Sequence, residues 1–132
     1  MTTIALVGNP NCGKTTLFNA LTGARQQVGN WPGVTVERKT GRYPHGGGTI
    51  QVVDLPGTYG LDETSGGLDE AIARNYLAGR TLDADRADVI VNVIDASSLA
   101  RGLFLTTALR DTGLPMVVAL NMIDVADRNG MH

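Results

Sequence analysis

The chain has 132 residues, of which 42% are hydrophobic and 18% charged, and a formal net charge of -2 at pH 7. This length suits one domain with one core, and the slight charge gives no electrostatic reason to expect a nucleic-acid partner or an anionic membrane surface. The single cysteine excludes an internal disulfide, and no stretch has the length of a membrane span or the pattern of a signal peptide. We therefore expect a soluble domain in a reducing cytoplasm.

Short apolar runs rich in β-branched residues predict strands buried on both faces, at 4–7, 50–53, 89–94 and 116–120. Helical patterns lie between them, at 14–22, 68–77 and 99–112. This alternation predicts an α/β fold: a doubly wound, mostly parallel sheet with helices on both faces. Segment 34–43 alternates only at its start, which predicts an exposed edge strand joined to the 50–53 strand by a turn at 46–48.

The first predicted strand leads directly into Gly8-Asn9-Pro10-Asn11-Cys12-Gly13-Lys14-Thr15, a complete phosphate-binding P-loop. A strand, a glycine-rich bend and a helix N-terminus direct backbone N–H groups at one point, which suits a polyphosphate. We expect Lys14 to contact the β- and γ-phosphates and the Thr15 hydroxyl to ligate Mg²⁺. The expected phosphate-binding set is Asn9, Pro10, Asn11, Cys12, Gly13, Lys14, Thr15 and Thr16.

The segment Asn30-Trp31-Pro32-Gly33-Val34-Thr35 follows the first predicted helix. Thr35 is the candidate that completes the Mg²⁺ shell when a triphosphate is bound, with Gly33 and Val34 beside the nucleotide. Taken alone, a threonine at a strand start reflects only β-propensity, and the P-loop is what favours the metal role. Trp31 either packs the loop down or contacts a partner and reports conformation.

Asp54-Leu55-Pro56-Gly57 follows the strand predicted at 50–53. A carboxylate at this end of a doubly wound sheet lies next to the P-loop, so Asp54 is expected to hold Mg²⁺ through a water. Gly57 has no side chain, so its N–H can approach the γ-phosphate. The following segment, 58–67, is rich in Gly, Ser, Thr and acids and predicts a mobile loop.

Asn121-Met122-Ile123-Asp124 follows the last predicted strand, at the end of the sheet where such folds bind ligands. Asp124 can accept two hydrogen bonds from guanine N1 and N2, which adenine cannot offer, and Asn121 and Met122 would lie beside the base. In isolation the Asn–Asp pair could simply cap a helix. Three upstream phosphate and metal motifs in the correct order favour the guanine site.

Together these motifs resemble those of the small GTPase superfamily. More narrowly, residues 8–11, 28–37, 54–59 and 121–124 resemble the N-terminal G domain of the bacterial ferrous iron transport protein B family. Its discriminating parts are the segment 30–35 and Met122, where most related GTPases carry lysine. The resemblance covers essentially the whole chain and implies GTP or GDP binding with Mg²⁺, GTP hydrolysis and regulation of ferrous iron transport.

The resemblance also implies parts that residues 1–132 do not contain. The chain reaches His132 soon after the guanine motif, so we expect a G domain that is incomplete at its C-terminal end. In the family this domain is tethered to a permease, through a helical domain, at the cytoplasmic face of the bacterial inner membrane. Helical and transmembrane domains of the same protein are therefore the expected partners, together with a guanine nucleotide and a second copy of the chain.

Thr58 stands where many GTPases carry a glutamine that orients the attacking water, which predicts slow hydrolysis. Relatives that lack this glutamine often recruit K⁺ through a P-loop asparagine, and Asn11 matches that asparagine. By its position beside Pro10, Asn11 can also be a turn former. The expected catalytic residues are Lys14, Thr35, Gly57 and Asn11, and the expected metal ligands are Thr15, Thr35 and Asp54 for Mg²⁺ and Asn11 for K⁺.

Two other functions fit parts of this pattern. One is a soluble GTPase of ribosome or transfer RNA maturation, although such proteins usually carry lysine at position 122. The other is a nucleotide-sensing module in which hydrolysis is incidental. We interpret Arg25 and Arg38 as solvated charges rather than arginine fingers, and His45 has no metal-binding pattern, so we expect no ferrous iron site in these residues.

Overall fold

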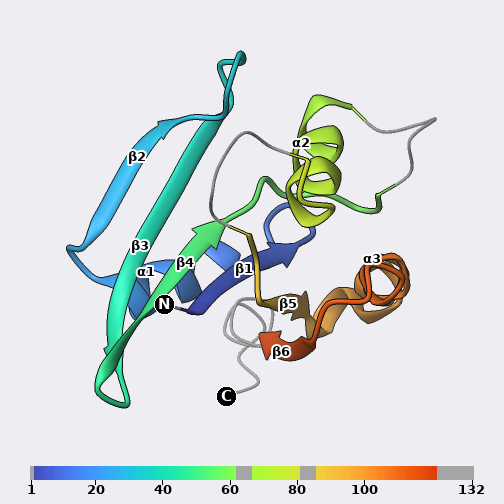
Figure 1. The fold of residues 1–132 in the computed structure, drawn as a ribbon. Coiled ribbons are helices and arrows are strands. Elements are labelled where there is room, and N and C mark those ends of the chain that lie inside the picture. The colour runs from blue at the N-terminus through green and yellow to red at the C-terminus, as the bar shows by residue number, and fades with distance from the viewer. Residues whose placement is uncertain (1, 62–66, 81–85, 122–132) are drawn as a thin grey trace.

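The computed structural model describes residues 2–61, 67–80 and 86–121, which form a six-stranded sheet and three α-helices (Figure 1). In chain order the elements are β1 (Thr2–Gly8), α1 (Lys14–Thr22), β2 (Gln26–Asn30), β3 (Glu37–His45), β4 (Gly48–Asp54), α2 (Leu68–Leu77), β5 (Val89–Asp95), the 3-10 turn η1 (Ala96–Ser98), α3 (Leu99–Arg110) and β6 (Met116–Asn121). No helix among these described residues is long and apolar enough to cross a membrane.

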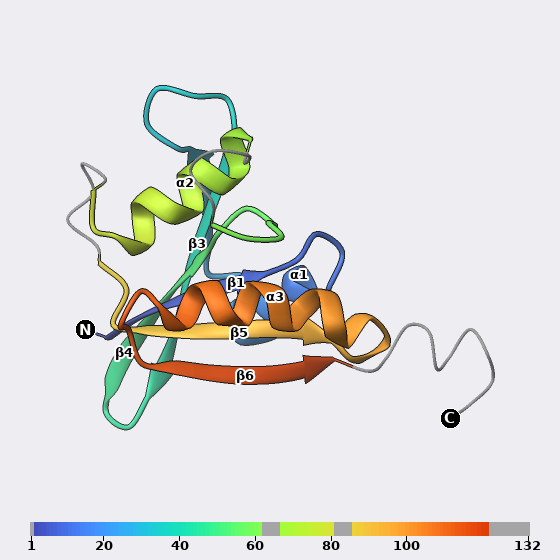
Figure 2. The same ribbon diagram turned by 90° about the vertical axis from the view of Figure 1, so that its right-hand side faces the viewer.

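The strands lie in the order β2-β3-β4-β1-β5-β6. The β4–β1, β1–β5 and β5–β6 pairs are parallel, whereas the β2–β3 and β3–β4 pairs are antiparallel. Helix α1 covers one face of the sheet, and α2 and α3 cover the other (Figure 2). The predicted doubly wound, mostly parallel α/β sheet is therefore confirmed.

Strand β1 supplies both cores because its side chains alternate between the two faces of the sheet. Ala5 and Val7 join the cluster under α2 and α3, while Leu6 packs with Phe18 of α1 in the cluster on the opposite face. All four side chains have no exposed surface. Burial of a side chain as large as Phe18 contributes about 1.5–3 kcal/mol, so α1 is held firmly behind the P-loop.

The antiparallel part of the sheet differs from the prediction. Gln26–Asn30, where no strand was predicted, forms the edge strand β2, and β3 begins at Glu37 rather than at residue 34. Val28, the only apolar side chain in β2, is 61% exposed, so β2 is held by backbone pairing and its sequence has no buried face to reveal it. The prediction that β3 is the edge strand is wrong.

The turn between β3 and β4 is confirmed. His45 pairs with Gly48, and Gly46 and Gly47 between them have φ of 57° and 80°. Two left-handed residues in a two-residue loop match the twist of an antiparallel hairpin, and glycine adopts them without strain.

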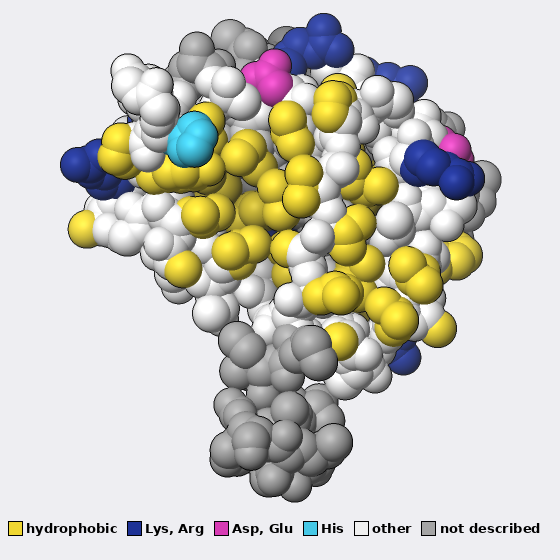
Figure 3. Space-filling view, turned by 90° about the horizontal axis from the view of Figure 1, so that it is seen from below, with side chains coloured by type: hydrophobic (Ala, Val, Ile, Leu, Met, Phe, Trp, Pro, Cys, Tyr) yellow, Lys and Arg dark blue, Asp and Glu magenta, His cyan; other side chains and the backbone are white. Residues whose placement is uncertain are grey.

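The underside of the molecule is apolar. Seen from below, hydrophobic side chains gather in a broad patch across the middle of this view (Figure 3). Separately, β6 leaves Val117, Val118 and Leu120 between 47% and 60% exposed. Among the described residues, the β6 edge of the sheet therefore exposes much apolar side-chain surface.

Candidate phosphate-binding site

The loop between β1 and α1 has the bend that its sequence predicts. Asn11 has φ 64° and Gly13 has φ 93°, both in the left-handed region, which asparagine and glycine tolerate best. The Cys12 N–H donates to the Asn9 carbonyl at 3.2 Å, and the Leu17 N–H donates to the Gly13 carbonyl at 3.2 Å to begin the ladder of α1. The free N–H groups of the first helical turn therefore open onto this loop.

A pocket of about 450 Å³ lies over this loop. It is lined by Asn9, Pro10, Asn11, Cys12, Gly13, Lys14, Thr15, Gly57 and Asp69. Residues predicted from two separate motifs, the P-loop and Gly57, thus share one concave site. Thr16 instead lines a smaller apolar pocket between α1 and β6.

Asp69 is the lining residue that the sequence did not single out. It lies in the first turn of α2, where an acidic side chain is ordinary because it interacts favourably with the helix dipole. Only the packing of α2 beside the phosphate loop gives Asp69 a place at the site.

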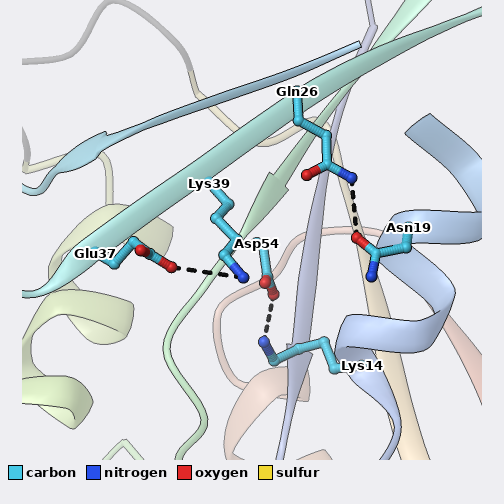
Figure 4. A network of polar contacts seen from close by, with 6 residues as sticks. All are labelled: Lys14, Asn19, Gln26, Glu37, Lys39 and Asp54. Atoms are coloured by element: carbon cyan, nitrogen blue, oxygen red, sulfur yellow. Dashed lines mark hydrogen bonds and ion pairs between the residues drawn. The ribbon is translucent and has the colours of Figure 1, made fainter. Parts of the chain in front are cut away.

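Lys14 and Asp54 form an ion pair at the base of the site (Figure 4). Lys14 is the first residue of α1, and Asp54 is the last residue of β4, the parallel neighbour of β1. Their side chains are 11% and 8% exposed, so the ammonium and the carboxylate are largely shielded from water. The structure thus brings together the predicted phosphate ligand and the predicted metal carboxylate.

Gly57 touches the backbone of the phosphate loop. A Cβ at this position would lie 2.9 Å from Pro10 Cα and 3.0 Å from Pro10 N, closer than such atoms normally pack. The next residue, Thr58, donates its N–H to the Gly8 carbonyl at 3.0 Å. The Asp54-Leu55-Pro56-Gly57 segment is therefore fastened against the P-loop, and glycine is required where the two backbones meet.

Thr58 is buried and turned to its own loop. Its hydroxyl donates to the Gly60 carbonyl at 2.8 Å, and the residue is 5% exposed. The side chain that stands where many GTPases carry a glutamine therefore forms a hydrogen bond within its own turn.

Asn121 also contacts the phosphate loop. Its side-chain Nδ2 donates to the Cys12 carbonyl at 3.1 Å. The sequence placed Asn121 near a base, and this contact to the P-loop carries no sequence signal because 109 positions separate the two residues. Met122, Ile123 and Asp124 lie outside the described residues.

The residues predicted in segment 30–35 lie away from the pocket. Thr35 and Gly33 are exposed, Val34 is half-buried against the core under α2, and none of them lines the pocket. Trp31 is 2% exposed, so of its two predicted roles the structure shows packing. Arg38, expected to be solvated, lies with its guanidinium Cζ 5.0 Å from the centre of the Trp31 ring.

Cys12 has the chemistry of an inert thiol. Burial raises the pKa of the Cys12 thiol, against the opposing effect of hydrogen bonding and the nearby Lys14 ammonium. A neutral thiol is a weak nucleophile and a poor metal ligand. In residues 2–61, 67–80 and 86–121, no group of three or more His, Cys, Asp or Glu side chains is placed to hold a metal ion.

Comparison with known proteins gives one consistent result. The family model described as "Ferrous iron transport protein B" matches residues 2–132. The Fe(2+) transporter FeoB of Shigella flexneri is 54% identical over 132 residues, which cover 98% of this chain and 16% of that protein. The Fe(2+) transporter FeoB of Salmonella typhimurium is 56% identical over 128 residues, covering 96% of this chain and 16% of its own length. The chain thus spans about one sixth of these relatives.

Solved structures agree. The G domain of the T. maritima FeoB iron transporter superposes with a TM-score of 0.85 at 44% identity, covering 97% of this chain and 76% of that one. A mutant of S. thermophilus NFeoB bound to GDP gives 0.83 at 52% identity, covering 98% and 48%. The cytosolic domain of L. pneumophila FeoB gives 0.83 at 53% identity, covering 98% and 52%. The chain belongs to the ferrous iron transport protein B family.

Proposed function

We propose that this chain binds guanine nucleotides and hydrolyses GTP to GDP and phosphate. The observation that carries the proposal is the Lys14–Asp54 ion pair beside a pocket lined by residues 9–15 of the P-loop. A phosphate-binding lysine and a metal-binding carboxylate on adjacent elements are the two charged groups that phosphoryl transfer to water requires. The GDP-bound relative, which is 52% identical, supports the choice of nucleotide.

The charged groups change partners when nucleotide binds. Lys14 Nζ now pairs with Asp54, and in the complex it would donate to the β- and γ-phosphate oxygens. Asp54 would then be free to hold a water of Mg²⁺, with the hydroxyls of Thr15 and Thr35 as direct ligands. Hydroxyl and carboxylate oxygens suit Mg²⁺, which neutralises phosphate charge when bound. Thr35 must move to take part, because its loop lies outside the pocket.

Hydrolysis should be slow unless another group orients the water or supplies positive charge. The Thr58 hydroxyl is already bonded to the Gly60 carbonyl, so it is not available to orient a water. We propose that K⁺ supplies the missing charge, with Asn11 as a side-chain ligand. Asn11 is exposed and lines the pocket, which supports this role.

In the whole protein we propose that nucleotide state regulates ferrous iron transport across the bacterial inner membrane. The relatives are named Fe(2+) transporters, and the L. pneumophila structure is a cytosolic domain. Residues 1–132 would then be a G domain on the cytoplasmic face, joined to helical and transmembrane domains. Iron is cargo in this scheme.

The decisive experiment measures phosphate release from GTP with Mg²⁺, in K⁺ and in Na⁺. We expect turnover that is faster in K⁺, abolished by Lys14→Ala and made insensitive to K⁺ by Asn11→Ala. Asp124→Asn should shift preference from guanine toward xanthine nucleotides. Absence of GTP turnover in either salt would overturn the proposed activity, whereas equal turnover in both salts would overturn only the role of K⁺.

A further inference from the structure

Trp31 joins the loop that carries Thr35 to helix α2. This loop, residues 31–36, connects Asn30 at the end of β2 to Glu37 at the start of β3, and these two residues pair with each other. The Trp31 ring meets the Tyr76 ring of α2 edge-on, with centroids 5.6 Å apart and planes at 68°. Edge-to-face contact adds to the stabilisation that burial of both rings already gives.

The loop is tied to the Trp31 ring as one unit. The Trp31 backbone N–H donates to the Val36 carbonyl at 3.0 Å, and the Val34 N–H donates to the Trp31 carbonyl at 3.2 Å. Val34 and Val36 also pack against the core cluster that contains Trp31. Thr35, the exposed residue between the two valines, is thereby held wherever the indole is held. Figures 1 and 2 both place this loop beside α2 and away from the P-loop.

Two opposed contributions act on the indole. Stacking of the Arg38 guanidinium over the ring and contact with Tyr76 favour the buried position. The buried indole N–H has no hydrogen-bond partner among the described residues, and a buried unpaired donor opposes burial. Withdrawal of the ring would give this N–H access to water, so the two positions of the ring are closer in free energy than packing alone would make them.

We propose that Trp31 is a positioning residue that controls delivery of Thr35. While the Trp31 ring is buried, it holds loop 31–36 outside the phosphate pocket. When the ring leaves Tyr76 and Arg38, Thr35 can reach the triphosphate and its metal. Since the ring packs on α2, the state of the loop is also communicated to that helix. The proposal rests on the proposed nucleotide-binding function and adds the contact that opposes loop closure.

Trp31 is the only tryptophan in the chain, so its fluorescence reports its own environment. Acrylamide quenching is measured with Mg²⁺ and GDP, and again with Mg²⁺ and a non-hydrolysable GTP analogue. We expect stronger quenching with the analogue because the ring then leaves the core. Equal quenching, when calorimetry shows that both nucleotides are bound, overturns the role of Trp31 and leaves the proposed function intact. Failure of both nucleotides to bind overturns the proposed function itself.

A substitution in α2 tests the same contact from the other side. Tyr76→Leu removes the ring edge but keeps an apolar side chain, and Tyr43→Leu makes the same change in the core on the opposite face of the sheet. We expect Tyr76→Leu to raise the affinity for the GTP analogue relative to GDP by roughly three- to tenfold, and Tyr43→Leu to leave that ratio unchanged.

Arg38→Met provides a second route if Tyr76→Leu does not fold. It removes the guanidinium from the Trp31 ring and should shift the ratio of affinities in the same direction. Trp31 is only a packing residue if neither variant changes the ratio, or if Tyr43→Leu changes it equally.

Discussion

The side-chain amide of Asn121, at the end of β6, donates a hydrogen bond to the carbonyl of Cys12 in the phosphate loop. A Cβ on Gly13 would lie 1.7 Å from Asn121 Nδ2, so a larger residue at position 13 would displace this amide. Gly13 is therefore favoured by its left-handed backbone, and its small size leaves room for the Asn121 amide. The first residue of the predicted guanine motif thus supports the loop that is proposed to hold the phosphates.

Asn121→Ala should loosen the phosphate loop. Loss of one hydrogen bond predicts about 1 kcal/mol weaker binding of GDP and of a GTP analogue alike, since the loop contacts both. Calorimetry with each nucleotide measures the effect. Asn19→Ala, which removes an exposed amide of α1 that accepts from Gln26, is the matched control. An effect on one nucleotide alone would show that Asn121 does not act through the loop.

Gly57→Ala should impair the junction of the two backbones. The added methyl group meets Pro10 backbone atoms that cannot rotate away, and overpacking of this kind costs about 1–3 kcal/mol of stability. We expect a lower midpoint of thermal unfolding and a larger loss of GTP turnover than of GDP affinity. Gly48→Ala is the control, because its nearest contact would be an ordinary 3.8 Å. Equal effects of both substitutions would contradict the contact.

Asp54→Asn should raise the Mg²⁺ concentration needed for half-maximal turnover by about 10- to 100-fold, the usual effect of losing a group that acts through a metal-bound water. Asp54 does not contact the phosphates in this scheme, and its loss removes a competing partner of Lys14, so nucleotide affinity without Mg²⁺ should not fall. Asp111→Asn, at the end of α3 and far along the chain from the site, is the control. An unchanged Mg²⁺ requirement would remove Asp54 from the metal site.

Cys12 should be slow to alkylate. Its raised pKa keeps the thiol protonated in the folded protein, so the pH midpoint of the reaction with iodoacetamide should lie above that measured after unfolding in denaturant. The same shift means that the folded state retains a proton that the unfolded state loses. Stability should therefore fall as the pH rises past the ordinary pKa of a thiol. Coincident midpoints in the two states would contradict the buried environment.

The parallel half of the sheet could be predicted from the sequence because three of its four strands, β1, β4 and β5, are largely buried. Each of these strands, and β6 with its exposed side chains, contains a near-continuous apolar run, and α1 and α2 have the predicted bounds. The antiparallel half could not, since β2 has one exposed apolar side chain and is held by backbone bonds that any residue can make. Because β2 has no buried face, its sequence does not alternate between apolar and polar residues.

The candidate site also has a part that could be predicted from the sequence and a part that could not. The P-loop and Gly57 are contiguous motifs with fixed backbone requirements, so their meeting in one pocket could be predicted. Asp69 and the Asn121–Cys12 bond depend on how distant elements pack, which one sequence does not report. Thr35 stays a predicted metal ligand, because its role requires a loop position other than the one described.

The burial of Thr58 limits how this protein could evolve faster turnover. A longer amide side chain at this position could not occupy the space of a threonine that is 5% exposed and bonded to the Gly60 carbonyl. A change to glutamine would first have to rebuild the turn at residues 58–60. Gains in rate are therefore more accessible through the solvent-facing side of the pocket, where Asn11 lies, than through the position at which other lineages place their catalytic glutamine.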